Sequence, residues 1–450
     1  MPAKPKTKSS RKQIRVAELF AGVGGFRLGL EAASPDFVTV FSSQWEPPGT
    51  PSKQFASRCY VERFGTEGHS NEDIAKVLDE VERGERKLPD IDMVVGGFPC
   101  QDYSVAKPLN QSAGLQGKKG VLWWEIHRLL RILKDKKKPA QWVFLENVDR
   151  LIKSPATQRG RDFAIMLASL CDLGYEVEWR VVNAADYGFP QRRRRVFIVA
   201  QLAGKAKSKK SGADVVFESG VFANSLPVHS DNRLDLSETE HFELTGELHE
   251  LSADFGRGVE RTKFGQAGYV RPIGIGASRK RIVWTYNPKP NFVGRSLLLR
   301  DVLERGAVPK QFFVIDAALA KWRTAKGSKA EERVHKASGF KYFYTEGALP
   351  FPDPVDRPSR TILTSEGGAS PSRSKHIVAA KDGGYRRLTP VELERLNGFP
   401  DDHTATEMTE TQRAFCMGNA LVVGLVEAIG VEVAVREAVR LRSKAVQNAT

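Results

Sequence analysis

Residues 14–200 alternate between two kinds of apolar spacing. Short apolar runs, typical of buried strands, are separated by stretches in which apolar residues recur every three or four positions, as on one face of a helix. The pattern predicts helices after residue 25 and over residues 122–133 and 162–173. This order of elements predicts an α/β fold built on a doubly wound sheet. The predicted strands cover residues 14–20, 37–41, 93–95, 143–145, 175–182 and 196–200.

The regular pattern stops near residue 204 and returns near residue 386. Residues 204–212 are rich in Lys, Ser and Gly, as linkers are, and residues 213–355 predict a separate unit rich in short strands and loops. Pro390 after Thr389 predicts a helix start, and residues 418–435 predict an apolar helix followed by polar residues. The predicted organisation is a disordered basic tail (1–13), the first part of an α/β domain (14–203), an inserted unit (204–385), a helical region completing the α/β domain (386–440) and a tail (441–450).

Charge and cysteine content narrow the class of protein. The 450 residues include 69 Lys and Arg against 54 Asp and Glu, a net charge of +15 that favours a polyanionic partner such as nucleic acid. No apolar stretch approaches the ~18 residues of a membrane span, and the basic start lacks the apolar segment of a secretory signal. The 4 cysteines lie far apart without a C-x-x-C pair. We therefore expect a reducing cytoplasm, no disulfides, no membrane and no metal.

Cys100 and Glu146 are the most informative pair of residues. Each stands just after an apolar run, so both are expected at the carboxyl ends of buried strands, where open α/β sheets gather their ligands. A lone cysteine in an apolar context is usually inert core. A thiol with a carboxylate beside it indicates instead a covalent nucleophile and an acid.

Small residues follow the first predicted strand. In residues 20–25, Phe-Ala-Gly-Val-Gly-Gly, the glycines let the backbone approach a ligand closely, and the start of the next helix favours polar or anionic groups. The cluster is not the G-x-G-x-x-G dinucleotide pattern, so it indicates another nucleotide-type ligand or only a tight turn. Trp45 and Glu46 follow the second strand, where the ring could stack on an adenine and the carboxylate could bind a ribose, or where Trp45 is simply half-buried.

A basic run, Gln-Arg-Arg-Arg-Arg at residues 191–195, leads into the last predicted strand. Because side chains alternate along a strand, Arg193 and Arg195 are expected on one side and Arg192 and Arg194 on the other. One pair could then face an active site while the other meets solvent or phosphate. Residues 114–120, rich in Gly and Lys, are either a mobile lid over the thiol or a plain loop.

Six ordered motifs in this chain resemble those of the DNA (cytosine-5) methyltransferase family. The resemblance covers residues 14–200 and 386–430, roughly half of the chain. It implies the doubly wound, mixed α/β sheet of S-adenosyl-methionine-dependent methyltransferases, with a smaller, inserted recognition domain rich in loops and strands. The motifs are F-A-G-x-G-G (20–25), G-F-P-C-Q (97–101), E-N-V (146–148), Q-R-R-R-R-V (191–196), R-L-T-P-x-E through L-N-G-F-P (387–400) and G-N-A (418–420).

The resemblance implies roles for individual residues. Cys100 would be the nucleophile, Glu146 the acid that contacts the flipped base, and Arg195 with Arg193 would hold the base and the cysteine loop. The implied contacts to S-adenosyl-methionine are Phe20, Gly22, Gly24, Gly25, Trp45, Glu46, Asp73, Ile74, Pro99, Leu122, Asn419 and Ala420. The implied contacts to DNA are Gln101, Ser104, Arg192, Arg194, Arg360 and Thr361.

One position departs from the family pattern. The family commonly has an acid just before the tryptophan to bind the ribose, and this chain has Gln44 there. Either Gln44 binds the ribose as a neutral partner or Glu46 turns in to do so.

Together the motifs predict a prokaryotic modification enzyme that methylates cytosine C5 at a specific site in double-stranded DNA. We expect a cytoplasmic monomer, with a companion restriction endonuclease acting on the same site. A tRNA cytosine methyltransferase is one alternative, which the long region 204–385 disfavours. A DNA-binding protein without activity is another, which the presence of Cys100, Glu146 and Arg195 disfavours.

Overall fold

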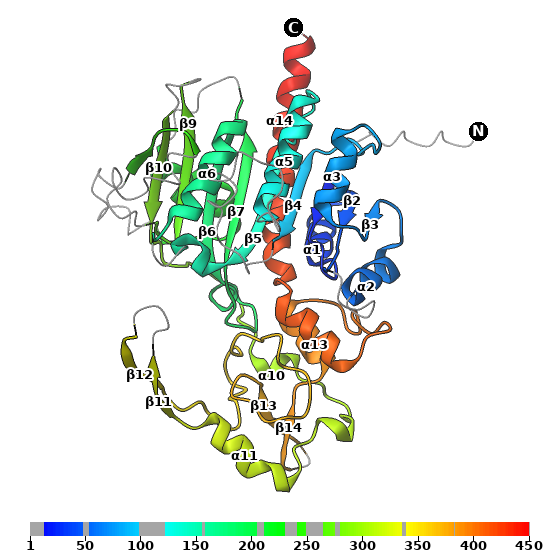
Figure 1. The fold of residues 1–450 in the computed structure, drawn as a ribbon, viewed down its shortest axis with the longest axis vertical. Coiled ribbons are helices and arrows are strands. Elements are labelled where there is room, and N and C mark those ends of the chain that lie inside the picture. The colour runs from blue at the N-terminus through cyan, green and yellow to red at the C-terminus, as the bar shows by residue number, and fades with distance from the viewer. Residues whose placement is uncertain are drawn as a thin grey trace, which may run out of the picture.

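The computed structural model describes residues 13–47, 54–98, 122–154, 158–204, 211–229, 241–248, 264–274, 280–334, 339–381 and 383–449. Its main feature is a ten-stranded sheet in the order β3-β2-β1-β4-β5-β7-β6-β9-β10-β8 (Figure 1). The strands of this sheet are β1 (Ile14–Leu19), β2 (Phe37–Ser43), β3 (His69–Ser70), β4 (Met93–Gly97), β5 (Trp142–Val148), β6 (Tyr175–Asn183), β7 (Arg194–Leu202), β8 (His241–Leu244), β9 (Ala267–Ile273) and β10 (Lys280–Tyr286).

The strand directions confirm the predicted doubly wound sheet, which contains both parallel and antiparallel strands. β3, β2, β1, β4 and β5 pair in parallel, whereas β7 pairs antiparallel with both β5 and β6. The central strands are buried on both faces, which explains their nearly continuous apolar sequences. The order reverses between β1 and β4, so the carboxyl ends of these strands border the crevice where doubly wound sheets bind ligands.

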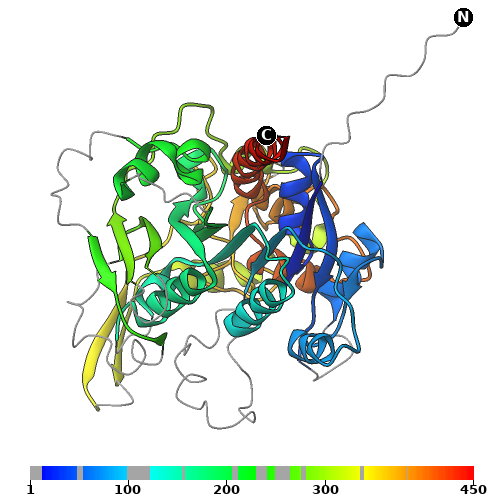
Figure 2. The same ribbon diagram turned by 90° about the horizontal axis from the view of Figure 1, so that it is seen from above.

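Helices cover both faces of the sheet, as the view from above shows (Figure 2). Apolar residues of α3, α5 and α6 form the core on one face, and those of α1, α2 and α12 to α14 form the core on the other. An added Cβ on Gly29 of α1 would lie 2.7 Å from Val426 of α14, so these two helices need a glycine where they meet. The helices are α1 (Gly25–Ala33), α2 (Phe55–Phe64), α3 (Ile74–Glu82), α5 (Leu122–Asp135), α6 (Arg161–Leu173), α7 (Gly212–Asp214), α8 (Val221–Ser225), α10 (Leu299–Val302), α11 (Asp316–Lys326), α12 (Pro390–Asn397), α13 (Glu410–Asn419) and α14 (Val423–Ala449).

The large sheet continues beyond residue 204, where the sequence analysis places the start of an inserted unit. β9 pairs antiparallel with β6, and β10 and β8 extend the sheet further. Trp179 of β6 donates a 3.2 Å hydrogen bond to Gly265 O, and an added Cβ on Gly268 would lie 2.1 Å from the ring of Trp179. The first part of the predicted insertion therefore belongs to the α/β domain.

A smaller unit lies below the carboxyl edge of the sheet in Figure 1. It contains α10, α11 and two small antiparallel sheets, β11 (Lys329–Val334) with β12 (Lys341–Glu346) and β13 (Ile377–Ala379) with β14 (Tyr385–Arg387). The chain then returns through α12 and α13 to the large domain. Of the region predicted to recognise DNA, the part that lies apart from the large sheet is thus the stretch between β10 and α12.

The predicted helix start at Pro390 is confirmed, but the predicted end of the chain is wrong. Thr389 accepts a hydrogen bond from Glu392 N, and the Glu392 side chain accepts one from Thr389 N, a capping box that fixes the start of α12. The apolar helix predicted over residues 418–435 is two helices, because α13 ends at Asn419 and α14 begins at Val423. The predicted polar tail from residue 441 is the last part of α14.

Within the described ranges, no single helix is both long and apolar enough to span a membrane. Only α13 and α14 taken together pass the test of length and composition, and they are bent by 41° at the break between them.

Candidate active site

The ends of β4 and β5 bring the two most informative sequence motifs together. Gly97 at the end of β4 is the registered partner of Glu146 in β5, and an added Cβ on Gly97 would lie 3.3 Å from Glu146 Oε2. Asn147 Nδ2 donates a 2.9 Å hydrogen bond to Phe98 O, which fixes the backbone where it leaves the sheet. Pro99, Cys100, Gln101, Ser104 and residues 114–120 lie outside the described residues. Phe98, two residues before Cys100, nevertheless directly follows the end of β4, and Gly97 of β4 is beside Glu146.

Glu146 forms an ion pair with Arg195 from the neighbouring strand β7. Arg195 Nε lies 2.8 Å from Glu146 Oε1, and the two side chains are 17% and 10% exposed. The antiparallel register of β5 and β7 places Val148, two residues after Glu146, opposite Arg195. The side chains of Glu146 and Arg195 therefore lie at the same end of the sheet. The structure thus brings a carboxylate and an arginine together at this end of the sheet.

Burial raises the pKa of Glu146, and the charges of Arg195 and Arg193 oppose this rise only in part. The carboxyl group therefore keeps its proton to a higher pH than an ordinary glutamate. A buried carboxyl group of this kind can donate a hydrogen bond to a ring nitrogen and stabilise charge that develops on a base.

The four arginines alternate as predicted. Arg192 and Arg194 are exposed, and Arg194 lies 3.1 Å from Asp149, whereas Arg193 is 1% exposed and Arg195 half-buried. The terminal nitrogens of Arg193 donate to Ile362 O at 3.2 Å and Gly418 O at 2.9 Å. Burial lowers the pKa of Arg193 to about 9. These contacts give Arg193 a supporting position between segments, and its predicted contact with the base stays a prediction.

The loop after β1 has the backbone that its glycines predicted. Phe20, Gly22 and Gly24 have positive φ angles of 55°, 56° and 88°. An added Cβ on Gly24 would lie 2.2 Å from Phe64, whereas an added Cβ on Gly22 would meet nothing within 4 Å. The loop therefore needs glycine for its shape, and it leaves open space above Gly22 that a ligand can approach.

Gln44 supports this loop. Gly22 N donates a 2.8 Å hydrogen bond to Gln44 Oε1, which orients the amide so that its oxygen faces the loop. No hydrogen-bond partner of Gln44 Nε2 lies in the described part of the chain. Gln44, the residue that departs from the family pattern, thus stands directly at the glycine turn.

Other predicted cofactor contacts surround the same crevice. Trp45 and Glu46 are half-buried after β2, and Asp73 caps α3 by accepting from Ala75 N at 3.0 Å. Gly25 packs against Leu421 and Phe399, since an added Cβ would lie 3.2 Å from each. The remaining predicted contacts are core-packed Ile74 and Leu122 and, at the end of α13, Asn419 and Ala420.

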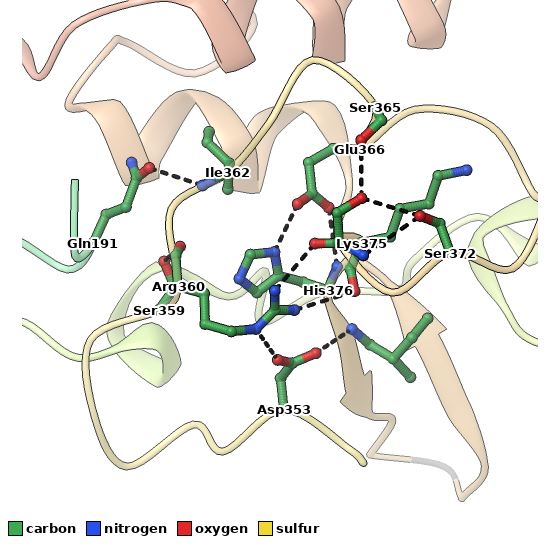
Figure 3. A network of polar contacts seen from close by, with 12 residues as sticks. Gln191, Asp353, Ser359, Arg360, Ile362, Ser365, Glu366, Ser372, Lys375 and His376 are labelled. Carbon is green, nitrogen blue, oxygen red and sulfur yellow. Dashed lines mark hydrogen bonds and ion pairs between the residues drawn. The ribbon is translucent and has the colours of Figure 1, made fainter. Parts of the chain in front are cut away.

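Arg360, a predicted DNA contact, is held by the smaller unit itself. It donates to Asp353 Oδ1 at 2.8 Å and to Ser374 O and Lys375 O at 3.2 Å each (Figure 3). Its predicted contact with DNA stays a prediction. Thr361 donates to Arg192 O through its hydroxyl.

Two polar residues that the sequence analysis gave no role are important here. Asn147 fixes the backbone before Cys100, and Gln191, 0% exposed, holds the backbone of Ile362 through a 3.0 Å bond from Ile362 N. Both residues lie inside motifs described above. Their position as polar residues close to predicted catalytic residues was the signal from which a structural role could have been predicted. Among the described residues, no group of three or more His, Cys, Asp or Glu could hold a metal ion.

Comparison with known proteins identifies the family. The model of C-5 cytosine-specific DNA methylases matches residues 14–434. The chain belongs to this family. It is a DNA (cytosine-5-)-methyltransferase, and the sequence-based prediction of family and enzyme class is confirmed. Membership in the methylase family implies dependence on S-adenosyl-methionine and binding of DNA.

Individual relatives of this methylase agree with that assignment. The type II methyltransferase M.Sau3AI of Staphylococcus aureus is 42% identical over 423 residues, which cover 93% of this chain and 95% of that protein. M.NlaIV of Neisseria lactamica is 26% identical, with 93% and 98% covered. The solved structure of S. pombe Dnmt2 matches 94% of this chain and 99% of its own with a TM-score of 0.55 at 16% identity, which shows a shared fold.

Proposed function

We propose that this methylase transfers a methyl group to C5 of a cytosine flipped out of duplex DNA, through a covalent adduct with Cys100. The observation that carries the proposal is the buried Glu146, paired with Arg195 and placed beside the backbone that leads to Cys100. A target atom inside a duplex is out of reach of such a buried carboxyl group, so the base must leave the stack.

The residue types explain the proposed chemistry. The Cys100 thiolate attacks C6, and the electrons of the C5–C6 double bond move into the ring, where protonated Glu146 holds the charge by donating to N3. C5 would then take the methyl group as the bond between that methyl group and the sulfonium sulfur of S-adenosyl-methionine breaks, which leaves S-adenosyl-homocysteine. Loss of the C5 proton restores the double bond and expels the Cys100 thiolate, so the enzyme emerges unchanged.

S-adenosyl-methionine would supply an electrophilic methyl group at the crevice between β1 and β4. The open space above Gly22 and the positive φ angles of the turn fit a nucleoside that lies close to the backbone. Trp45, Glu46 and Asp73 would bind its adenosine part, with Asn419 and Ala420 closing the pocket. We propose that Gln44 contacts the ribose through Nε2, since Gly22 holds its oxygen.

Changing Gln44 tests this assignment. In Gln44→Leu we expect the affinity for S-adenosyl-homocysteine to fall roughly tenfold, the effect of losing about one hydrogen bond and its support of the loop. Isothermal titration calorimetry in the absence of DNA measures this directly. In the matched variant Gln44→Glu one oxygen can still accept from Gly22 N and the other from a ribose hydroxyl, so we expect affinity at least equal to wild type. Unchanged affinity in Gln44→Leu would remove Gln44 from the cofactor site.

The wider setting is part of the proposal. The M.Sau3AI relative is named a type II methyltransferase. We propose accordingly that this methylase acts as a cytoplasmic monomer and protects DNA at the site cut by a companion restriction endonuclease.

Methyl transfer from labelled S-adenosyl-methionine to mixed genomic DNA, followed by base-resolution mapping of 5-methylcytosine, tests the proposed function. We expect label in DNA at cytosines of one short sequence context. Label in tRNA and none in DNA would overturn the proposal in favour of a tRNA methyltransferase. Label in neither would leave a DNA-binding protein.

A further inference from the structure

A buried set of polar groups joins the catalytic strand β7 to the recognition unit. We call Gln191, Arg193, Ile362, Asn397 and Gly418 the junction. Gln191 and Arg193 precede β7, Asn397 ends α12, Gly418 lies near the end of α13, and Ile362 begins a segment of the recognition unit. Gln191, Ile362 and Asn397 are 0% exposed and Arg193 is 1% exposed, so water does not compete for these hydrogen bonds.

The junction holds both backbone groups of Ile362. Ile362 N donates to Gln191 Oε1 at 3.0 Å, and Ile362 O accepts from Arg193 Nη1 at 3.2 Å. Gln191 Nε2 donates in turn to Asn397 Oδ1 at 2.9 Å, so the orientation of the amide is fixed from both sides (Figure 3 shows Gln191 and Ile362). The position of Ile362 is thereby set by the residues that lead directly into β7.

On its other side, Ile362 is followed by a surface segment, residues 363–375, that is held by buried hydrogen bonds near its ends. Glu366 accepts from both His376 N and His376 Nδ1 (Figure 3). Lys375 Nζ donates 2.9 Å bonds to Gly368 O and Ser370 O. Between these buried anchors the segment presents exposed side chains, namely Leu363, Thr364, Ser365, Ala369 and Ser370. The three hydroxyl side chains among them, on a loop held at both ends, suit contact with base edges and phosphates.

On the catalytic side, Arg193 of the junction is two residues before Arg195, which pairs with Glu146. Arg193 also donates to Gly418 O, adjacent to the proposed cofactor residue Asn419. An added Cβ on Gly418 would lie 2.2 Å from Thr364 N, so the end of α13 rests directly on the surface segment. A displacement of the segment therefore acts on a strand end that positions Arg195.

We propose that Gln191 is a positioning residue that couples the surface segment 363–375 to the Glu146–Arg195 pair, so that contact with the correct DNA sequence raises the rate of methyl transfer as well as the affinity. This inference rests on the proposed function. In this proposal the DNA sequence is read at one end of the junction, and the Glu146 carboxyl group is aligned at the other.

Gln191→Met, which keeps the volume and loses both hydrogen bonds, is the test variant. Single-turnover rate constants and dissociation constants are measured on a duplex with the mapped target context and on duplexes with one base pair changed. We expect a roughly tenfold lower rate on the correct duplex and little change on the altered ones. The ratio of rates then falls, while the ratio of dissociation constants stays near wild type. An equal loss of rate on all duplexes, or an unchanged ratio, would overturn the coupling.

Thr361→Val covers the case in which Gln191→Met does not fold. The Thr361 hydroxyl, at a partly exposed position, donates to Arg192 O and forms a second link between the segment and the lead into β7. We expect the same direction of change with a smaller loss of rate discrimination, and thermal unfolding close to wild type. Intact rate discrimination in this variant counts against the coupling, whereas wild-type enzyme that labels no DNA would overturn the proposed function itself.

Discussion

Cys100→Ala is expected to lower the rate of methyl transfer by on the order of 10⁴-fold or more, because the variant lacks the thiol that we propose forms the bond to C6. Binding of duplex DNA and of S-adenosyl-homocysteine should change little, since the substitution removes a single sulfur atom. Single-turnover transfer of labelled methyl groups and separate binding titrations distinguish the two effects.

A trapped adduct gives a second readout for Cys100. In a duplex with 5-fluorocytosine at the target, C5 carries fluorine where a proton would leave, so the double bond cannot re-form and the thiol stays attached. Wild-type enzyme should then form a complex with DNA that survives denaturation, and Cys100→Ala should form none. A denaturation-resistant complex in the variant would assign the nucleophile to another residue.

Glu146→Gln is expected to lower the single-turnover rate by roughly 10²–10⁴-fold, the usual contribution of a positioned acid. The amide keeps a donor for N3 and an oxygen for Arg195, but it cannot move a proton. The raised pKa of Glu146 means that the active, protonated form is lost as pH rises through that pKa. The wild-type rate should therefore fall with increasing pH through this group, and this dependence should vanish in Glu146→Gln.

Stability provides the control for Glu146→Gln. A carboxyl group whose pKa is raised by folding stabilises the protein most below its unfolded-state pKa, and this contribution is lost as pH rises towards the folded-state value. At neutral pH the glutamine variant should therefore unfold at a temperature no lower than wild type. A variant that is less stable and equally fast at all pH values would contradict the acid role.

Local sequence patterns predicted the part of the fold that depends on local spacing. The strands around Met93 and Trp142 are buried on both faces, so their apolar runs were continuous and easy to recognise. The glycine turn after β1 and the alternation of the arginines before β7 follow from backbone geometry alone, and both are confirmed. The motif around Cys100 predicts a role for it, although Cys100 itself is outside the described residues.

The features that the sequence did not reveal depend on partners distant in the chain. Nothing near β9 shows that it pairs with β6, because strand pairing leaves no local spacing signal. Arg360 has the same charge as a phosphate-binding arginine, and only the fold shows that Asp353 engages it. The break between α13 and α14 was hidden because Leu421 remains buried against Gly25, which continues the apolar pattern through the break.

The packing of the last helices on the first ones determines when a newly made chain can acquire activity. His403 Nε2 lies 2.7 Å from Val23 O, although the two residues are 380 positions apart in the sequence. Leu421 packs on Gly25, and Val426 packs on Gly29. Until the ribosome has released α14, the face of the sheet that α1 and α2 also cover lacks the part of its cover that the last helices supply, and the glycine turn after β1 lacks its support from Leu421. We therefore expect activity only after the final helix has been made, and the partly uncovered apolar face is most prone to aggregation during that interval.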